Sequence, residues 1–456
     1  MESNVFNSAE IVLLKAIVNA TSPNKRHNWK SFPGDYEGWE GINWARFDGE
    51  YRVESIDAPK KGLKGALAFA PMACLRFLDL ARNFLRELDV SNNSALELLD
   101  MSENRLTKLD VSNNAALDYL DVSDNRLMEL DVSNNVVLEH LHASGNRLSS
   151  FNASSNPKLE FLNLSDNWLT KLDVSNNADL GRLDLSYNRL TNLDVSGNVN
   201  LVVLSASHNR LKSIDVSNNA HLSELELVDN QLSSLDVSKN LSLNDLELAD
   251  NQFHSIDVSN NAALDFLNLS KNRLTALDVS RNPELRLLYA SDNLLTQLDL
   301  SHNAFLARLD VSRNRLEALD VSGNDFLSSL NVEGNRLPLS QLHGLMKIDE
   351  LTVGQQTNVA IPGLPRDTLA VGQPYDIGSE KSFNGVPTTI TVILNGYLAT
   401  KNLHYTLEDG IIIFISDGEY QIAMKNPEIH NKNEDFDSSD ALITTPNLTV
   451  GPAKGA

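Results

Sequence analysis

Residues 117–137, LDYLDVSDNRLMELDVSNNVV, contain the pattern on which most of the chain is built. The stretch has two similar halves, each with Leu-x-x-Leu-x-Val and an asparagine three residues later. The same frame begins at Leu75 and returns without insertion to Phe326, which makes twelve units of 21 residues. A thirteenth first half follows, and one asparagine recurs every 21 residues from Asn83 to Asn335. A fixed period of this length is typical of a solenoid of stacked turns.

Each half-repeat has the spacing of a short strand followed by a turn. In Leu120-Asp121-Val122 the apolar residues alternate with a polar one, as they do in a strand with one buried face. Asparagine suits the point where the chain leaves the strand, because its amide can bond with backbone groups that the turn leaves unpaired. Strands on successive turns would lie about 4.8 Å apart. The sequence therefore predicts a curved solenoid with parallel strands.

Both halves resemble the core segment of the leucine-rich repeat, Leu-x-x-Leu-x-Leu-x-x-Asn-x-Leu. Nested halves of 10 and 11 residues with Asp-Val-Ser in the second resemble the 21-residue repeats of bacterial internalin-like surface proteins. Some of those proteins have cysteine at the inward site of the first half, where this chain has Val122, Ala143, Leu164 and Leu185. The resemblance covers roughly residues 50–345. It implies an α/β-type repeat solenoid with little helix, recognition of a macromolecule, and an extracellular or cell-surface location.

The 456-residue chain is acidic, with a formal net charge of -23 at pH 7. That charge argues against nucleic acid or an anionic membrane as the partner. Because Cys74 is the single cysteine, no disulfide within the chain is expected. No apolar run reaches the roughly 18 residues of a membrane span, so membrane insertion is not expected. The first 25 residues show no secretory signal pattern.

Residues 1–74 precede the regular repeat and are predicted to form its N-terminal cap. Residues 8–20 have the apolar spacing of a helix. Trp29, Trp39 and Trp44 follow within sixteen residues. The stretch resembles the cap that precedes some plant and bacterial leucine-rich repeats, and a solenoid needs its apolar end covered. The alternative is a tryptophan-lined sugar site, although large aromatic side chains usually fill cores.

The 21-residue period ends at Pro338, and residues 340–349 are predicted to form a short helix that closes the array. This places the repeat solenoid at residues 75–349 and a further domain at residues 350–456. The strands predicted in that domain are residues 388–398, 410–416, 420–425 and 447–450. Residues 416–422, SDGEYQI, resemble the tyrosine corner of an immunoglobulin domain. An all-β, immunoglobulin-like sandwich is therefore predicted.

The second half of the repeat is nearly uniform along the chain. Serine follows the core residue in all twelve copies, from Ser91 to Ser322, and aspartate precedes it in every copy except at Asn152. Closely spaced carboxylates repel one another, so each aspartate is expected to accept hydrogen bonds from serine and backbone N–H groups of an adjacent turn. The alternative, a metal-binding row, lacks the glycine and acidic ligand positions of a calcium loop. No metal and no cofactor are predicted.

The first half of the repeat varies at its outward-facing sites, which strand alternation directs away from the core. In leucine-rich-repeat proteins these sites line the concave sheet where partners bind. An aromatic and basic region comprises Tyr119, His140, His142, Phe161, Arg182, Tyr187 and His208. An acidic patch comprises Glu224, Glu226, Asp229, Asp245, Glu247 and Asp250, and two further candidates are Phe266 and Tyr289. The alternatives are aromatic residues that simply suit strands, and a solvated acidic face or a calcium site.

Arginine follows the first-half asparagine in eight of the thirteen copies, including Arg105, Arg126 and Arg315. In the two acidic repeats the same site holds Gln231 and Gln252. The row is interpreted as a solvated edge that nearby acids neutralise.

No catalytic constellation is visible, because no nucleophile has a base at a fixed local spacing. The chain is therefore predicted to be a non-enzymatic recognition or adhesion protein that binds a macromolecule, first of all a protein, on the concave face. The alternative is a carbohydrate-binding surface protein whose exposed aromatic side chains stack on sugars. The protein is expected to act as a monomer.

Overall fold

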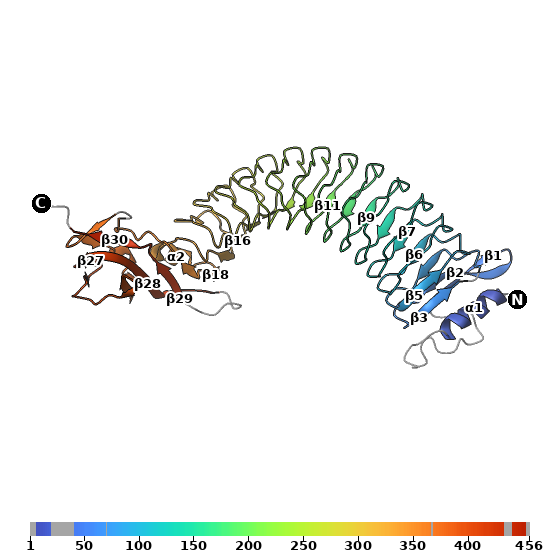
Figure 1. The fold of residues 1–456 in the computed structure, drawn as a ribbon, viewed down its shortest axis with the longest axis horizontal. Helices are drawn as coiled ribbons and strands as arrows, with labels where there is room; N and C mark the ends of the chain where they lie inside the picture. The colour runs from blue at the N-terminus through green and yellow to red at the C-terminus, as the bar shows by residue number, and fades with distance from the viewer. Residues whose placement is uncertain (1–5, 20–40, 70, 366–367, 433–439, 453–456) are drawn as a thin grey trace. The chain divides into compact units, whose positions relative to one another are not determined.

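The computed structural model describes residues 6–19, 41–69, 71–365, 368–432 and 440–452. The chain divides into two compact units, and the division falls between Leu243 and Asn244. We refer to them as the N-terminal unit and the C-terminal unit (Figure 1). The α-helices are α1 (Ser8–Asn19) and α2 (Leu339–Leu345). Within the described ranges, neither helix combines the length and the apolar character that crossing a bilayer requires.

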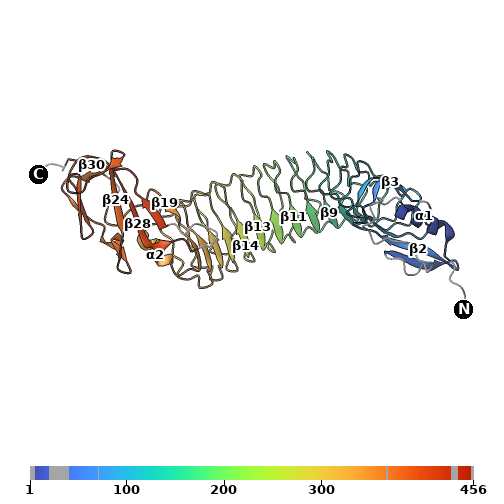
Figure 2. The same cartoon turned by 90° about the horizontal axis from the view of Figure 1, so that it is seen from below.

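The repeats of the N-terminal unit form a parallel sheet of three-residue strands, one on each turn. The strands are β4 (Phe77–Asp79), β6 (Leu98–Asp100), β7 (Tyr119–Asp121), β8 (His140–His142), β9 (Phe161–Asn163), β10 (Arg182–Asp184), β11 (Val203–Ser205) and β12 (Glu224–Glu226). Neighbours pair in register, so Leu120 lies beside Leu141 and Leu162 beside Leu183, and all four are buried. The strands lie on one side of the turns, as Figure 2 shows for β9 and β11. The predicted parallel-stranded solenoid is confirmed.

Asparagine side chains tie successive turns together, as predicted. The buried Asn188 accepts the N–H of Leu169 at Oδ1, 2.9 Å away. Its Nδ2 donates to the carbonyl oxygens of Leu164 at 2.9 Å and Leu185 at 3.1 Å. Leu164 and Leu169 belong to the preceding turn and Leu185 to the same turn, so one amide satisfies buried backbone groups of both.

The aspartates of the second half bond within their own turn, which corrects the expectation that they bond to an adjacent one. Oδ1 of Asp131 accepts the backbone N–H of Ser133, two residues further on, at 2.9 Å. The same bond recurs in the other turns of the N-terminal unit. Two asparagines supply the links to the preceding turn. Nδ2 of the exposed Asn134 donates to the carbonyl oxygen of Ser112 at 3.0 Å, and Nδ2 of the buried Asn135 donates to that of Asn114 at 2.8 Å. The aspartate row is therefore a series of local turns.

These local bonds predict that acid destabilises the protein. The backbone N–H and hydroxyl of Ser133 hold the pKa of Asp131 below its ordinary value of 3.8. Serine does the same for nine further aspartates of the row. A carboxyl group with a lowered folded-state pKa stabilises the fold above its unfolded-state pKa and loses that contribution as the pH falls through the folded-state value. The melting temperature should therefore fall as the pH drops below about 4.

Asparagine variants of the aspartate row test this acid dependence. Asn152 already accepts the N–H of Ser154 in the natural chain, at 3.0 Å. A variant with asparagine at Asp131, Asp173 and Asp215 should therefore keep its melting temperature at neutral pH and lose less stability in acid. Burial raises the pKa of four other carboxyl groups, those of Glu10, Asp79, Asp118 and Asp121. Protonation of these groups stabilises the fold as the pH falls through their folded-state pKa, which opposes the effect of the aspartate row. An identical acid profile in variant and wild type would show that the three substituted aspartates do not contribute to the acid dependence.

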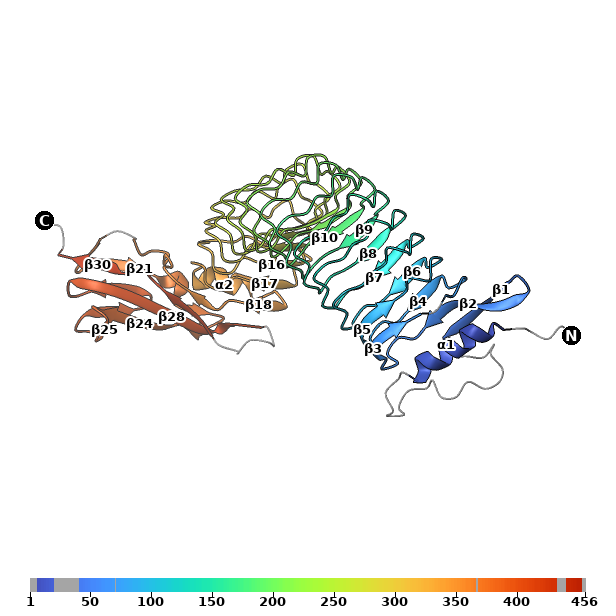
Figure 3. The same ribbon diagram turned by 45° about the vertical axis from the view of Figure 1, so that its right-hand side comes forward.

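A β-hairpin and a helix precede the repeats in the N-terminal unit. β1 (Ile42–Phe47) pairs antiparallel with β2 (Glu50–Asp57), and β2 joins β4 in parallel. Helix α1 lies alongside these strands (Figure 3). It is held by the buried Glu10, whose Oε2 accepts the N–H of Val53 at 2.8 Å. A second parallel pair, β3 (Lys64–Ala68) with β5 (Phe84–Asp89), lies in the first turns of the array.

One of the three tryptophans predicted for this region can be placed. Trp44 packs edge-on against Phe6, with ring centroids 5.0 Å apart, and Phe6 stacks on Tyr51 at the same centroid distance. Trp44 therefore packs among aromatic side chains, as expected of a cap residue. Trp29 and Trp39 lie outside the described residues.

The strand ladder of the C-terminal unit extends beyond Pro338, where the sequence period ends. Its strands are β13 (Asp245–Glu247), β14 (Phe266–Asn268), β15 (Leu287–Tyr289), β16 (Arg308–Asp310), β17 (Ser329–Asn331) and β18 (Glu350–Thr352). β18 pairs in register with β17. Gln356 then takes the place of a ladder asparagine, because its Oε1 accepts the N–H of Leu337 at 3.1 Å and its Nε2 donates to the carbonyl oxygen of Val332 at 2.9 Å. The sequence analysis did not identify this last rung.

Helix α2 lies between β17 and β18 and is shorter than the predicted 340–349. Its apolar side, Leu339, Leu342 and Leu345, is buried. The fully buried Glu380, in the 3-10 helix η2 (Gly378–Glu380), accepts the N–H of Ser340 through Oε2 at 3.1 Å. A carboxylate from the following domain thus satisfies a free N–H in the first turn of the helix.

The rest of the C-terminal unit is a β domain, which confirms the predicted β class. Its strands are β19 (Gln355–Gln356), β20 (Leu369–Ala370), β21 (Pro374–Asp376), β22 (Ser382–Phe383), β23 (Val386–Pro387), β24 (Thr389–Leu394), β25 (Tyr397–Leu398), β26 (Tyr405–Glu408), β27 (Ile411–Phe414), β28 (Gly418–His430), β29 (Asp440–Thr444) and β30 (Leu448–Gly451). β28 pairs antiparallel with β24, β29 and β30. β21, β27 and β26 form a second sheet. The fully buried Tyr420 has its hydroxyl 3.0 Å from the carbonyl oxygen of His404 and 3.1 Å from that of Ser416, which are contacts expected of a tyrosine corner.

Candidate partner-binding surface

The outward sites of the first half-repeats lie on one face of the sheet in the N-terminal unit. In β7, β8 and β9 the middle leucine is buried and its two neighbours are half-buried on the opposite face. Register places Tyr119, His140 and Phe161 in one row and Asp121 with His142 in the next. Because each strand is bonded to both neighbours, these side chains have a fixed spacing along the sheet.

Four aromatic side chains form one cluster, the aromatic platform, which consists of Tyr119, His140, His142 and Phe161. The ring of His142 stacks on that of Phe161 with centroids 4.4 Å apart and lies 5.5 Å from that of Tyr119. His140 lies 6.1 Å from Tyr119 and 6.3 Å from Phe161. Arg182 on β10 adds a cation, with Cζ 5.9 Å from the Phe161 centroid. The structure thus brings together five of the seven residues predicted for the aromatic and basic region.

The other two, Tyr187 and His208, lie in turns beyond the strands. Both have positive φ, 55° and 56°, which is uncommon for bulky residues. Their rings stack with centroids 4.1 Å apart. Nδ1 of His208 lies 2.9 Å from Oδ2 of Asp229, a residue that the sequence analysis had assigned to the acidic patch. The alternation of residues along a strand does not predict this turn conformation. Because both residues lie in turns, Tyr187 and His208 form a site distinct from the aromatic platform.

A row of three carboxylates flanks the platform, and the sequence analysis missed it. Asp79, Asp100 and Asp121 lie in register on β4, β6 and β7. Each accepts the N–H of the residue two positions further on, at 2.8 Å. Burial, with a smaller contribution from neighbouring carboxylates, raises the pKa of Asp79 and Asp121. The sequence did contain a pattern that could have predicted this row, because aspartate occupies the same outward site in three consecutive repeats.

Burial also determines the charge of the platform. It lowers the pKa of His142, although the nearby Asp121 carboxylate acts in the opposite direction. It raises the pKa of Tyr119, with Asp121 adding to the rise. At neutral pH the central imidazole is therefore mostly uncharged and the phenol stays protonated. The platform presents an aromatic surface between an acidic row and the guanidinium of Arg182.

The six residues of the predicted acidic patch fall into two groups of three, one in each unit. One group lies on β12 and the turn after it, and the other on β13 and the turn after it. Asp229 contacts His208, and Oδ2 of Asp250 lies 3.8 Å from Nζ of Lys271. At least two of the six carboxylates thus have a partner already, and the joint patch stays a prediction. Among the described residues, no group of three or more His, Cys, Asp or Glu is arranged to hold a metal ion.

Phe266 and Tyr289 form a smaller aromatic pair in the C-terminal unit. They lie half-buried on the adjacent strands β14 and β15, with ring centroids 5.6 Å apart. Register places Tyr289 beside Asn268, so the contact between the two rings is diagonal. Two rings offer less flat apolar surface than the four rings of the platform.

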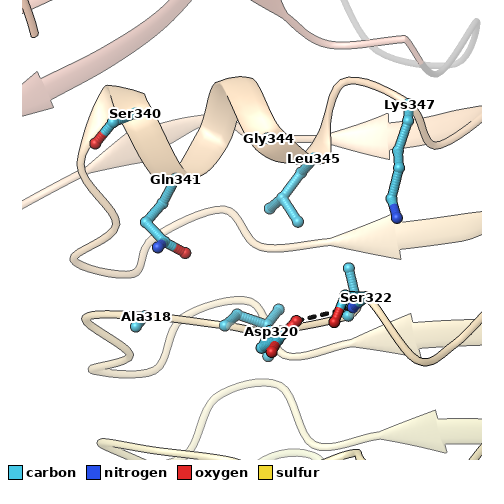
Figure 4. A pocket seen from close by; sticks show the side chains of 10 residues that line it. Ala318, Asp320, Ser322, Ser340, Gln341, Gly344, Leu345 and Lys347 are labelled. Atoms are coloured by element: carbon cyan, nitrogen blue, oxygen red, sulfur yellow. Dashed lines mark hydrogen bonds between the residues drawn. The ribbon is translucent and has the colours of Figure 1, made fainter. Parts of the chain in front are cut away.

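A groove of about 340 Å³ lies beside α2 in the C-terminal unit (Figure 4). Gln341 and Leu345 of the helix line one side, and Asp320 and Ser322 of the last second-half turn line the other. Asp320 already accepts the N–H of Ser322 at 2.9 Å. By the 21-residue period, α2 lies where a further Asp-Val-Ser half would stack. The groove therefore lies where the stack of second half-repeats ends. None of the predicted site residues lines the groove.

Comparisons with protein-family models and with curated proteins find no match. Among solved structures, the chain is similar to the functional domain of InlJ from Listeria monocytogenes, with a TM-score of 0.65 and 24% identity over 87% of this chain and 89% of that one. It is similar to the internalin InlF of the same species, with a TM-score of 0.53 and 21% identity over 58% and 85% of the two chains. It is also similar to YopM from Yersinia enterocolitica, with a TM-score of 0.55 and 27% identity over 69% and 67%.

These structural neighbours confirm the leucine-rich-repeat fold, and internalin-like bacterial proteins are among them. The InlJ domain includes a cysteine ladder. The inward sites of the first half-repeat in this chain include Val122, Ala143, Leu164 and Leu185, and all four are buried. Its core is therefore built on aliphatic side chains at these sites.

Proposed function

We propose that this chain is a non-enzymatic recognition protein that binds a protein partner on the strand face of its N-terminal unit. The aromatic platform is the observation that carries the proposal. Aromatic side chains and arginine are enriched at the centres of protein interfaces, and here four rings and Arg182 share one patch of sheet. The leucine-rich-repeat fold itself supports a protein-binding role in general.

Three further proposals concern the whole chain. Its internalin-like structural neighbours support an extracellular or cell-surface location. The hydrogen bonds of Tyr420 support an immunoglobulin-like fold for the domain that follows residue 349. The chain is proposed to act as a monomer, with residues 1–74 as a cap and residues 75–349 as the repeat solenoid.

Removing the two outer rings of the platform should weaken partner binding strongly. The change is Tyr119→Ala with Phe161→Ala. The affinity should fall by at least about thirtyfold, because even one central aromatic anchor contributes on the order of 2 kcal/mol. Phe305→Ala with Phe326→Ala is the matched control. Those two rings are exposed in turns of the C-terminal unit, with centroids 5.9 Å apart, and their loss should leave affinity unchanged.

The partner for this measurement can be obtained by site-specific cross-linking. A photoreactive phenylalanine analogue at Phe161 should form adducts with a surface protein of the target cell, and the same group at the exposed Asn134 should not. Equal adducts from both positions would contradict binding on the strand face. A glycan array run with the same variants tests the alternative: glycan binding that disappears with Tyr119→Ala, without protein adducts at position 161, would favour carbohydrate recognition.

A further inference from the structure

A row of exposed arginines runs along the turns of the N-terminal unit, at a site the proposed function does not use. We call it the arginine row. Each member is the first residue after a first-half ladder asparagine, and aromatic residues take the same site on two turns. In chain order the site holds Phe84, Arg105, Arg126, Arg147, Trp168, Arg189 and Arg210, and all seven side chains are exposed.

The backbone gives this row a regular spacing. The N–H of Arg126 donates to the carbonyl oxygen of Leu106, the residue that follows Arg105, at 2.8 Å. The same bond, also 2.8 Å long, links each later member of the row to the turn before it. Consecutive members are therefore about 4.8 Å apart, and the row extends over roughly 29 Å. The neighbouring asparagines, which bridge the turns, limit any change in this spacing.

The arginines of the row form no ion pair with the acidic residues that the structure describes. In the part of the chain that the structure describes, none of the five forms an ion pair, whereas Arg76 and Arg82 pair with Glu97 and Glu103. For these five residues the described part of the chain thus shows no direct pairing with an acid, and neutralisation of the edge by nearby acids stays a prediction. Like charges on adjacent rungs are unfavourable, so the row combines mutual repulsion with free hydrogen-bonding capacity.

Aromatic rings share the row with the guanidinium groups. Cζ of Arg105 lies 4.7 Å from the ring centroid of Phe84, and Cζ of Arg189 lies 5.6 Å from that of Trp168. Trp168 is 43% exposed in spite of this contact. The row thus combines five positive groups with two aromatic rings whose surfaces remain accessible.

We propose that the arginine row binds a linear acidic polysaccharide, laid across successive turns of the N-terminal unit. Guanidinium groups pair with carboxylate or sulfate groups through two parallel hydrogen bonds. The Trp168 ring can stack on the apolar face of a sugar. A polymer with acidic groups spaced by whole sugar units suits a row with at most one cation per 4.8 Å or so.

Duplex nucleic acid fits this surface less well. It has one negative charge per roughly 1.7 Å of its axis, which is far denser than the row. Asp124 and Asp166 lie in the turns, two residues before Arg126 and Trp168, and would repel a dense polyanion. The net charge of -23 adds a long-range repulsion to any such ligand.

Titration with polygalacturonate, alginate, neutral dextran and duplex DNA tests the proposal on the full chain, because the first two polymers carry one carboxylate per sugar unit. Polygalacturonate or alginate should bind more tightly than DNA, dextran should not bind, and binding should weaken with added salt. The variant Arg126→Gln with Arg147→Gln should lose about tenfold or more in affinity. Trp168→Ala should also weaken binding, and Trp168→Phe should restore it in part. Melting temperatures would confirm folding, because none of these changes removes a backbone bond.

Lys60→Gln with Lys158→Gln is the matched control, since both lysines are exposed and lie outside the row. It removes the same charge and should leave the affinity for the acidic polysaccharides within about twofold, as expected of distant screened charges. Failure of both acidic polysaccharides to bind would overturn the proposal. Equal losses in the arginine and lysine variants would also overturn it, and tighter binding of DNA through the same arginines would assign the row to nucleic acid instead.

Discussion

Replacing Asn188 with leucine is expected to lower the free energy of unfolding of the N-terminal unit by roughly 1–3 kcal/mol. The buried amide bonds the N–H of Leu169 and the carbonyl oxygens of Leu164 and Leu185. Leucine has a similar volume but no donor or acceptor, so these backbone groups would stay buried without partners. Urea unfolding followed by circular dichroism measures the change.

Two neighbouring asparagines provide graded controls. Asn176 is exposed, and its Nδ2 donates to the carbonyl oxygen of Ser154 at 3.4 Å, so Asn176→Leu should change stability by less than about 0.5 kcal/mol. Asn177 is buried and donates to the carbonyl oxygens of Ala153 and Asn156, while its Oδ1 has no hydrogen-bond partner among the described residues. The loss of stability in Asn177→Leu should therefore lie between the losses in Asn176→Leu and Asn188→Leu. Equal shifts at all three positions would show that the number of bonds per amide does not determine stability.

Ending the chain after residue 349 is expected to lower the free energy of unfolding of the remaining repeats, residues 244–349, by roughly 3–6 kcal/mol. The truncation removes β18 and Gln356 and so uncovers Leu330 and Leu337, both of which are buried. Burial of one leucine side chain contributes about 1.5–3 kcal/mol. The truncation also removes Lys432, whose Nζ donates to the carbonyl oxygen of Ile348 at 3.2 Å, and the bond from Glu380 to α2.

Thermal unfolding of the full and truncated chains tests whether the proposed domain boundary at 349 is also a folding boundary. If residue 349 is a folding boundary, the repeats of the truncated chain should melt at the same temperature as in the full chain. That result would contradict the expected destabilisation. Gln356→Leu in the full chain isolates the last rung. The N–H of Leu337 and the carbonyl oxygen of Val332 would each lose the side-chain amide as hydrogen-bond partner, at a cost of roughly 1–3 kcal/mol. The exposed neighbour Gln355 supplies the control, since Gln355→Leu leaves these bonds in place.

Much of the fold could be predicted because each turn repeats the one before it. A leucine at position 120 implies a leucine beside it at position 141, and the register confirms this pairing. The candidate platform could be predicted for the same reason, because strand alternation and a constant period place Tyr119, His140 and Phe161 in one row. Tyr420 could be predicted from its local motif, since one of its hydrogen bonds reaches a residue only four positions away.

The sequence by itself determined the period, the strand face, the asparagine ladder and the presence of a β domain. The first three follow from contacts between residues a fixed number of positions apart, and the β domain follows from alternating apolar residues bounded by turn residues. The tertiary structure alone decided which side chains form pairs where the repeat varies. The positive φ of Tyr187 and His208 separates them from the platform, and Gln356 replaces an asparagine outside the period. Within the described ranges, the arginines of the row form no ion pair. These outcomes depend on turn dihedral angles and on neighbours that differ from one turn to the next, and a repeating pattern carries no information about either.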